Sequence, residues 1–443
     1  MPIEHAMNAI SERHRADILI IGGGAAGLLA ALAARRKARE RSIVDSDFRI
    51  VVLERNARPG AKIRISGGGK CNVTHDGAVG EMLVQGFFRK SEQRFLRPAL
   101  YAFTNDDLRR MLRKRSVPTA VRDDGKVFPV SGRACDVLAA IEAELRDASV
   151  DVVTGTRVRS CLRQNGVFCI HTKMSDFFCS RLVLATGGVS YRHTGTTGDG
   201  LHIAASFGHD LVPSSPSLAP FFLRHPVAAA LSGVALRDVL LSFRTPSETV
   251  SRKGDVLLTH KGLSGPACFS LSRDAADLMG RESGGEALVN FFPDFSAEDM
   301  QEMLLRHASA HGKQLIRKFL QLQSAIPSGM IPLVLKQAAI EGDIGWGSLT
   351  KNARCRLQRT LQSFSFGEVK AIPLDAGEVS AGGIALGQVN AKTMESRICR
   401  DLFLCGEILD YAGEVGGFNL QAAFSTGWLA GSSSASGSAG TGV

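Results

Sequence analysis

Apolar residues near the amino terminus form two runs, which three consecutive glycines separate. The first run, "ADILII" at 16–21, is short and β-branched, which is typical of a buried strand. The second run, "AAGLLAALAARRKARE" at 25–40, is rich in Ala and Leu and ends in cations, which is typical of a helix. The uncharged stretch 18–34 spans 17 residues, whereas a membrane-spanning helix needs about 20. The pattern therefore predicts a strand, a tight glycine turn and a helix.

Similar patterns organise the rest of the chain. A second buried strand, "FRIVVLE", ends at Glu54. Helical spacing resumes late in the chain, behind a capping box of Ser296 and Asp299. We therefore predict a doubly wound, Rossmann-like α/β domain of the glutathione-reductase type with an insertion. Its expected parts are a loose arm (1–15), the first half of the domain (16–195), an inserted β-rich subdomain (196–295), an inserted helical subdomain (296–365), the second half of the domain (366–431) and a flexible Gly/Ser tail (432–443).

The first glycine turn has the spacing G-x-G-x-x-G at Gly22, Gly24 and Gly27. A predicted strand precedes it and a predicted helix follows, which is the context that dinucleotide binding requires. In such a turn the second glycine lets the backbone approach a pyrophosphate, and the third lets helix and strand pack closely. The free N–H groups at the helix start, Ala25 and Ala26, then face the phosphates.

A carboxylate follows the second strand. Glu54 stands 27 residues after Gly27, where an acidic side chain can accept hydrogen bonds from both ribose hydroxyls of a bound dinucleotide. The same charge would repel a 2′-phosphate, so NADP is not expected at this site. Its neighbour Arg55 is a further predicted cofactor contact.

Three further glycine-rich stretches suit a ligand longer than a nicotinamide dinucleotide. They are "KIRISGGGKCNVTH" (62–75), "LVLATGGVSYRHTGTTGDG" (182–200) and "RDLFLCGEILDYAGEVGGFNLQAAFSTGWLAG" (400–431). Small residues let the backbone run against a ligand, and a helix that starts near 418 can stabilise the negative charge that a flavin gains on reduction. We therefore predict noncovalent FAD. The predicted contacts in these stretches are Lys62, Ser66, Gly67, Gly69, Asn72, Thr186, Gly187, Gly188, Gly406, Glu407, Gly417, Phe418 and Asn419.

These stretches, together with "GKVFPVSGRACDV", "LLTHKGLSGPA" and "TMESR", resemble the BaiN/YhiN-like flavoproteins, a family that includes FAD-dependent oxidoreductases and aminoacetone-oxidase-type enzymes. The matches run in the same order from about 17 to 431, and "SGGGKCN" and "GGFNLQ" are far more specific than the first glycine motif. The resemblance implies a two-part FAD domain with an inserted unit. It also implies FAD contacts at Glu54, Cys71, Asn72 and 417–419, and glutathione-reductase-like folds place a residue such as Val158 against the adenine.

"TGDG" and "GGFN" are also similar to the fumarate reductase and succinate dehydrogenase flavoproteins. Those proteins usually carry an Arg just after the Asn, and the Arg helps to hold a dicarboxylate. Leu420 follows Asn419 here, which favours a less charged, small organic substrate. No second G-x-G-x-x-G follows a predicted strand, so NADH or NADPH would act only as a transient electron donor.

Few side chains are candidates for acid–base catalysis. His260 lies in a polar turn, and Tyr191 and His193 follow a predicted flavin loop, so these three are the catalytic candidates. Each also has a structural alternative as a capping, surface or packing residue. Cys71 has no partner cysteine nearby, which favours a packing role.

Charge and cysteine content limit the class of protein. The formal net charge is +10 and the sequence pI about 9.3, which keeps a tRNA-modifying flavoprotein as an alternative. Nucleic acid is the less favoured partner, because no aromatic residues alternate with the basic runs. The nine cysteines lack a CxxC pair, which favours the cytoplasm and predicts no metal site. The sequence carries no signal for an oligomeric state, and a flavin-bearing regulatory protein is a third alternative.

Overall fold

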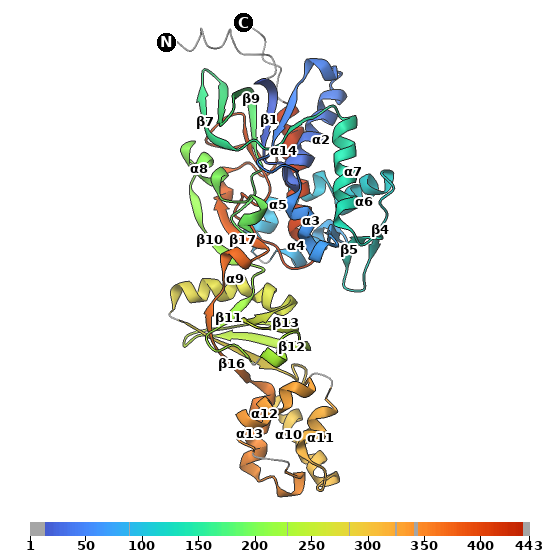
Figure 1. The fold of residues 1–443 in the computed structure, drawn as a ribbon, viewed down its shortest axis with the longest axis vertical. Coiled ribbons are helices and arrows are strands. Elements are labelled where there is room, and N and C mark those ends of the chain that lie inside the picture. The colour runs from blue at the N-terminus through green and yellow to red at the C-terminus, as the bar shows by residue number, and fades with distance from the viewer. Residues whose placement is uncertain are drawn as a thin grey trace. The chain divides into compact units, whose positions relative to one another are not determined.

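The computed structural model describes residues 14–87, 89–227, 229–282, 284–323, 326–340 and 344–436, so all but the last two residues of the predicted arm lie outside it. The chain divides into two compact units (Figure 1). The first comprises Met1–Ser214 and Val379–Val443, and the second comprises Ser215–Glu378. The insertion is therefore shifted toward the carboxyl terminus relative to the predicted 196–365. Segment 196–214 belongs to the first unit, where Arg55 Nη1 binds Thr197 Oγ1 at 2.6 Å and Asp199 Oδ2 at 3.4 Å.

A seven-stranded sheet forms the centre of the first unit, with the order β6-β2-β1-β9-β8-β7 and with β18 also paired to β9. Its parallel strands are β1 (Arg15–Ile21), β2 (Ile50–Leu53), β6 (Asp151–Val153), β9 (Asp176–Leu184) and β18 (Leu402–Leu404), and its antiparallel strands are β7 (Val158–Gln164) and β8 (Val167–Thr172). All residues of β2 and β18 are buried, as expected of strands that are covered on both faces. The predicted doubly wound fold class is confirmed.

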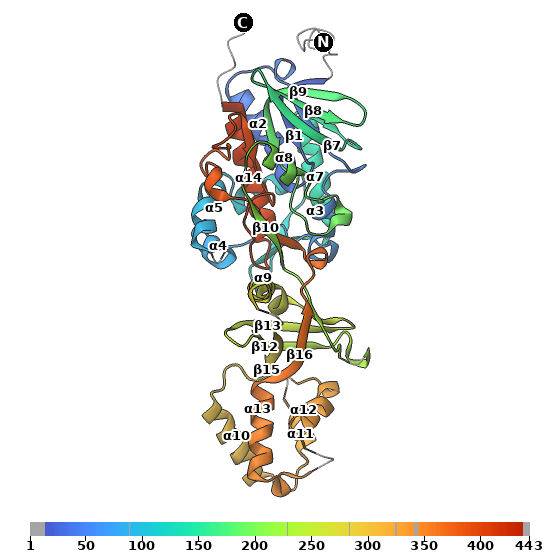
Figure 2. The ribbon, with the colours of Figure 1, turned by 90° about the vertical axis from the view of Figure 1, so that its left-hand side faces the viewer.

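Helices α2 (Ala25–Glu40) and α14 (Phe418–Ser436) lie side by side (Figures 1 and 2). Small residues let their backbones approach closely. A Cβ atom on Gly431 would lie 1.9 Å from the carbonyl oxygen of Ala30, and one on Gly427 would lie 2.1 Å from that of Ala26. Because this contact continues past Gly431, with Ser434 buried, residues 432–436 are helical. The prediction of a flexible tail is wrong for them, and 437–443 lie outside the described residues.

The other elements of the first unit surround the sheet. The helices are α3 (Ala61–Ile65), α4 (Val79–Gly86), α5 (Lys90–Ala102), α6 (Asn105–Lys114), α7 (Ala134–Asp147) and α8 (Asp199–Ser206). The strands are β3 (Thr74–His75), β4 (Thr119–Val121) and β5 (Lys126–Pro129) in a three-stranded sheet, and the pair β10 (Leu211–Ser217) and β17 (Val379–Ile384). Among the described residues, no helix has both the length and the apolar character needed to cross a membrane.

The second unit combines a closed β-barrel with α-helices (Figure 2). The barrel strands are β11 (Phe221–Leu223), β12 (Ala235–Arg244), β13 (Thr249–Thr259), β14 (Gly262–Ser264), β15 (Glu286–Asn290) and β16 (Phe364–Ala371). The helices are α9 (Pro266–Arg281), α10 (Ala297–Ala310), α11 (Ile316–Gln321), α12 (Ile331–Gln337) and α13 (Lys351–Gln362). One apolar core includes both Phe243 of the barrel and Trp346 of the helical part. The two predicted subdomains therefore form one unit.

Substitution of Gly431 by Ala tests the close contact between α2 and α14. We expect the free energy of unfolding to fall by about 1–3 kcal/mol, because the new methyl group forces the helices apart. Gly80→Ala is the matched control, since Gly80 is also helical and its Cβ would meet no atom within 4 Å. We expect the control to be neutral or slightly stabilising. Equal stability of the two variants by urea unfolding would contradict the proposed contact.

Candidate functional site

Four neighbouring strands end together at one edge of the sheet. The register pairs Ile21 of β1 with Leu53 of β2 and with Leu184 of β9, and it pairs Leu184 with Leu404 of β18. The residues that follow these strands include Gly22, Glu54, Thr186 and Gly406. Because the carboxyl ends of parallel strands share an edge, Glu54 and the first, third and fourth glycine motifs lie side by side.

The first turn is built for a close backbone approach. Gly22 has φ +109°, and a Cβ there would lie 2.4 Å from the carbonyl oxygen of Ala185 in the third motif. Gly24 differs, because a Cβ at this position would meet no atom within 4 Å. Gly24 also precedes α2 without any side-chain cap, and the first turn of α2 contains no acidic residue. The helix N-terminus therefore presents uncapped N–H groups to an open space, as an anion site requires.

Glu54 is held beside this helix start. Its Oε2 accepts a hydrogen bond from the Gly23 N–H at 2.8 Å, and its Oε1 accepts one from the Asn56 N–H at 2.7 Å. The side chain is only 7% exposed, so the two bonds fix its orientation. The N–H of Thr156 donates to the Glu54 carbonyl oxygen at 2.8 Å, which brings the segment before Val158 to the same place.

The second motif forms a compact left-handed loop. Gly67, Gly68 and Gly69 all have positive φ, and Cys71 has φ +58°. Burial raises the pKa of the Cys71 thiol to about 11, so the thiol stays protonated near neutral pH and is not a nucleophile. Asn72 Oδ1 is buried and has no hydrogen-bond partner among the described residues. The loop therefore leaves an amide acceptor available to a ligand.

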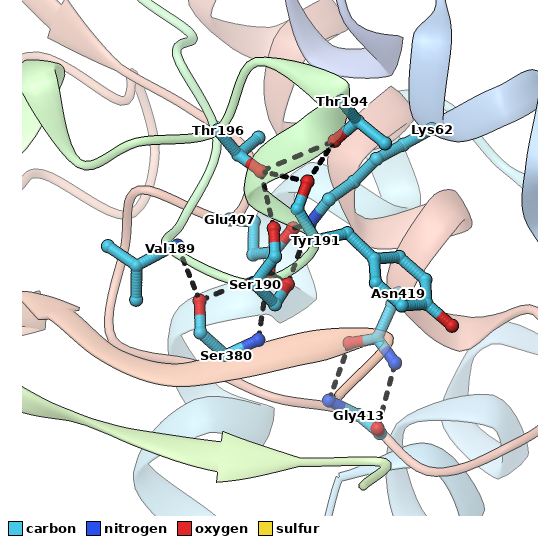
Figure 3. A network of polar contacts seen from close by, with 10 residues as sticks. All are labelled: Lys62, Val189, Ser190, Tyr191, Thr194, Thr196, Ser380, Glu407, Gly413 and Asn419. Atoms are coloured by element: carbon cyan, nitrogen blue, oxygen red, sulfur yellow. Dashed lines mark hydrogen bonds and ion pairs between the residues drawn. The ribbon is translucent and has the colours of Figure 1, made fainter. Parts of the chain in front are cut away.

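Glu407 is the centre of a polar network that joins four segments (Figure 3). Its Oε2 accepts a hydrogen bond from Lys62 Nζ at 2.8 Å, and its Oε1 accepts one from Ser190 Oγ at 3.1 Å. Ser380 donates to the same Oε1 through its backbone N–H at 2.9 Å and through its hydroxyl at 3.1 Å. Lys62 Nζ also donates to Ser190 Oγ at 2.8 Å. The network thus ties the second, third and fourth motifs to β17.

Tyr191 begins a constrained loop directly after this network (Figure 3). Its φ is +48°, and the Thr194 N–H donates to its carbonyl oxygen at 2.8 Å. Thr196 Oγ1 also donates to the carbonyl oxygens of Ser190 and Tyr191. The rings of Tyr191 and His193 lie 5.4 Å apart. The structure therefore brings these two catalytic candidates together next to the Glu407 network.

The start of α14 is fixed by its own side chains. Asn419 accepts a hydrogen bond from the Gly413 N–H at 2.7 Å and donates to the Gly413 carbonyl oxygen at 2.8 Å (Figure 3). The Phe418 ring stacks on His75 at 4.5 Å, and a Cβ on Gly417 would lie 2.5 Å from the Thr74 carbonyl oxygen. The fourth motif therefore packs directly on the second, and the amide of Asn419 shapes the loop.

Some of the residues predicted to form the site do not take part in the Glu407 network. Arg55 points to the 195–199 loop, where it also donates to the Gly195 carbonyl oxygen at 3.2 Å. Ser66 Oγ donates to the Ile63 carbonyl oxygen at the end of α3. His260 belongs to the second unit, at the exposed turn between β13 and β14. It is not among the residues that hydrogen-bond to Glu407.

Sequence reasoning missed three residues that organise the site. Ser190 lies inside the third glycine-rich motif, but nothing in the sequence indicates a role for its hydroxyl group. Ser380 lies on β17, after the insertion, in a stretch whose sequence does not point to the other motifs. His75 ends the second motif, and its Nδ1 lies 3.2 Å from the Gly416 carbonyl oxygen. Each of these residues contacts another segment of the chain, and only the folded structure shows that contact.

The family assignment rests on a match over almost the whole chain. The family described as "HI0933-like protein Rossmann domain" matches residues 16–433. The chain belongs to this family. Membership confirms the resemblance to BaiN/YhiN-like proteins and the predicted enzyme class, an FAD-dependent oxidoreductase.

Two relatives are similar to this chain over nearly their whole lengths. The chain is 30% identical over 417 residues to the 3-dehydro-bile acid delta(4,6)-reductase of Clostridium scindens, covering 94% of this chain and 98% of the relative. It is 28% identical over 418 residues to the ribosomal RNA dihydrouridine synthase of Escherichia coli, covering 94% and 96%. A solved structure, the 3-ketosteroid-delta4-(5alpha)-dehydrogenase from Rhodococcus jostii RHA1, shares 14% identity and a TM-score of 0.48, with 98% of this chain and 99% of that chain covered.

A double-mutant cycle tests the pair formed by Lys62 and Glu407. We expect Lys62→Met and Glu407→Gln each to destabilise the flavin-free protein. The free energy of unfolding of the double variant should fall by about 1–2 kcal/mol less than the sum of the losses in the two single variants. The reason is that each single change leaves a half-buried charge without its partner. The control is the exposed pair of Arg224 and Glu368, which is 2.6 Å long and should show little coupling. Additive losses at Lys62 and Glu407 in urea unfolding would show that the pair is not coupled.

Proposed function

We propose that the protein binds FAD noncovalently and reduces a carbon–carbon double bond conjugated to a carbonyl group in a small organic substrate. The observation that carries the cofactor assignment is that the first, third and fourth glycine motifs and Glu54 follow strands that end at one sheet edge, and that Lys62 joins the second glycine motif to them through Glu407. An extended ligand with phosphates and a planar polar ring is the kind of molecule that such a set of turns can enclose.

The residues at the edge fit the chemistry of FAD. The uncapped start of α2 and the open space at Gly24 suit a pyrophosphate. Glu54 keeps lone pairs for ribose hydroxyls, since each oxygen receives one protein donor. The unpartnered, buried Asn72 Oδ1 suits an N–H group on a ring edge, and Thr186 Oγ1 is a second buried polar atom without a partner among the described residues. When bound there, FAD supplies a hydride equivalent to the substrate.

The names of the relatives support the substrate class. A 3-dehydro-delta(4,6) bile acid carries double bonds conjugated to a ketone, and dihydrouridine arises by saturating the double bond of a uracil ring next to a carbonyl group. Conjugation makes the β-carbon of such a bond electrophilic, so it can accept a hydride, while the α-carbon needs a proton. Tyr191 and His193 are our candidates for supplying that proton and for binding the carbonyl oxygen. NADH or NADPH is the proposed transient electron donor.

Ribosomal RNA is the second candidate substrate. The net charge of +10 favours it, as do the names of two relatives. The two basic runs, "ARRKARER" (34–41) and "RRMLRKR" (109–115), do not supply the binding surface by themselves. Arg39 pairs with Asp45 at 2.6 Å, and Arg115 contacts both Glu144 and Asp147 at 2.5 Å. Much of their charge is therefore balanced within the protein, which is why we favour the small organic substrate.

Reoxidation of the reduced flavin tests the proposed function. The purified protein should release FAD on denaturation. After anaerobic reduction with NADH or NADPH, a cyclic α,β-unsaturated ketone should restore the oxidised spectrum and gain two hydrogens by mass spectrometry, whereas the matched saturated ketone should do neither. Reoxidation by oxygen alone would indicate an oxidase and contradict the proposal. Reoxidation only by unmodified ribosomal RNA, with a strong dependence on salt, would favour the second candidate instead.

A further inference from the structure

Three side chains of different chemistry lie on one face of the hairpin formed by β8 and β9. Cys169 and His171 are two residues apart on β8, so both point to the same face. The antiparallel register places Asp176 of β9 directly opposite His171. The alternating residues Phe168 and Ile170 point to the other face and are buried. The register therefore collects a thiol, an imidazole and a carboxylate on the outer face.

The potential metal-binding atoms of these side chains are close together. His171 Nδ1 lies 2.9 Å from Asp176 Oδ1. Cys169 Sγ lies 3.5 Å from His171 Nε2 and 4.0 Å from His171 Nδ1. One ligand atom from each residue fits within 4.8 Å of the others. Atoms that bind one zinc ion at about 2.0–2.3 Å are themselves roughly 3–4 Å apart, so small side-chain rotations would suffice.

The backbone that carries the cluster is firmly held. Thr172 Oγ1 donates to the Ser175 carbonyl oxygen at 2.6 Å and accepts hydrogen bonds from the N–H groups of Met174 and Ser175 at 3.2 and 3.1 Å. These bonds close the turn between the two strands. β8 also pairs with β7 along its other edge. The strands that bear the three side chains are thus fixed before any ion binds, which favours binding.

We propose that Cys169, His171 and Asp176 bind one divalent ion of the zinc class, with solvent completing a tetrahedral shell. A thiolate and an imidazole favour zinc over magnesium or calcium, which take oxygen ligands. On binding, the Cys169 thiol releases its proton to solvent, and no ligand changes oxidation state. The cysteine spacing predicted no metal site, because a CxxC search does not detect ligands that two paired strands bring together.

The proposed ion is remote from the cofactor edge. Asp176 and Leu184 are the two ends of β9, and eight steps along a strand span about 26 Å. The ion therefore cross-links β8 and β9 and takes no part in the redox reaction. Because of this separation, the metal site and the proposed function can fail independently.

Metal binding by the full-length, untagged holoprotein tests this proposal. After treatment with a chelator, the protein should bind one Co²⁺, with the thiolate charge-transfer band and the visible absorption of a tetrahedral site, and Zn²⁺ should displace it. Cys169→Ser should abolish the charge-transfer band. His171→Ala and Asp176→Asn should each weaken Zn²⁺ binding by about 10-fold or more. FAD content should stay unchanged in all three variants, which separates this test from that of the cofactor site.

The control is Cys135→Ser, which removes an exposed thiol elsewhere in the first unit. It should leave the Co²⁺ spectrum and the Zn²⁺ affinity as they are in the unchanged protein. Binding that is equally strong in all four variants would be that of an adventitious ion only and would overturn the proposal. The absence of any Co²⁺–thiolate band in the unchanged protein would overturn it as well.

Discussion

Parallel strands that end in register are the constraint on which the candidate site depends. Ile21 lies beside Leu53 and Leu184, and Leu184 lies beside Leu404. Four stretches that lie apart in the sequence therefore begin at one edge. The turns can then approach each other only where side chains are missing, as at Gly22, whose Cβ would collide with the Ala185 carbonyl oxygen. The glycines of the motifs therefore let the turns pack closely against each other, as well as leaving space for a ligand.

Helix packing adds a second constraint to the same edge. α2 starts in the first motif and α14 starts in the fourth, so the contact between them fixes two helix N-termini at once. A Cβ on Gly406 would also lie 2.7 Å from the Ala26 side chain, which packs the turn after β18 against the first turn of α2. Glu407, the next residue, then joins Lys62 and Ser380 in the polar network (Figure 3). Packing in the core thus sets the geometry of the polar site.

The sequence allowed the fold class and the identity of the motifs to be predicted, because strand–turn–helix patterns and glycine spacings are local signals. The boundaries of the insertion and the end of α14 at Ser436 were not predictable in this way. They depend on long-range contacts, such as Arg55 with Asp199 and Gly431 with Ala30. Ser380 was missed for the same reason, since nothing local links it to Glu407. Tyr191 and His193 are two residues apart in one loop, so their proximity could be expected from the sequence.

Gly24 offers the most direct test of the claim that the four motifs enclose FAD. Gly24→Asp places a carboxylate at the N-cap of α2, where it should stabilise the flavin-free protein slightly. The same charge should weaken FAD binding by about 100-fold or more, because it occupies and repels the pyrophosphate position. Gly80→Asp, at another open helical position, should leave the Kd for FAD unchanged. Titration of both flavin-free variants with FAD decides the question, and equal affinity for FAD in the two variants would contradict the account.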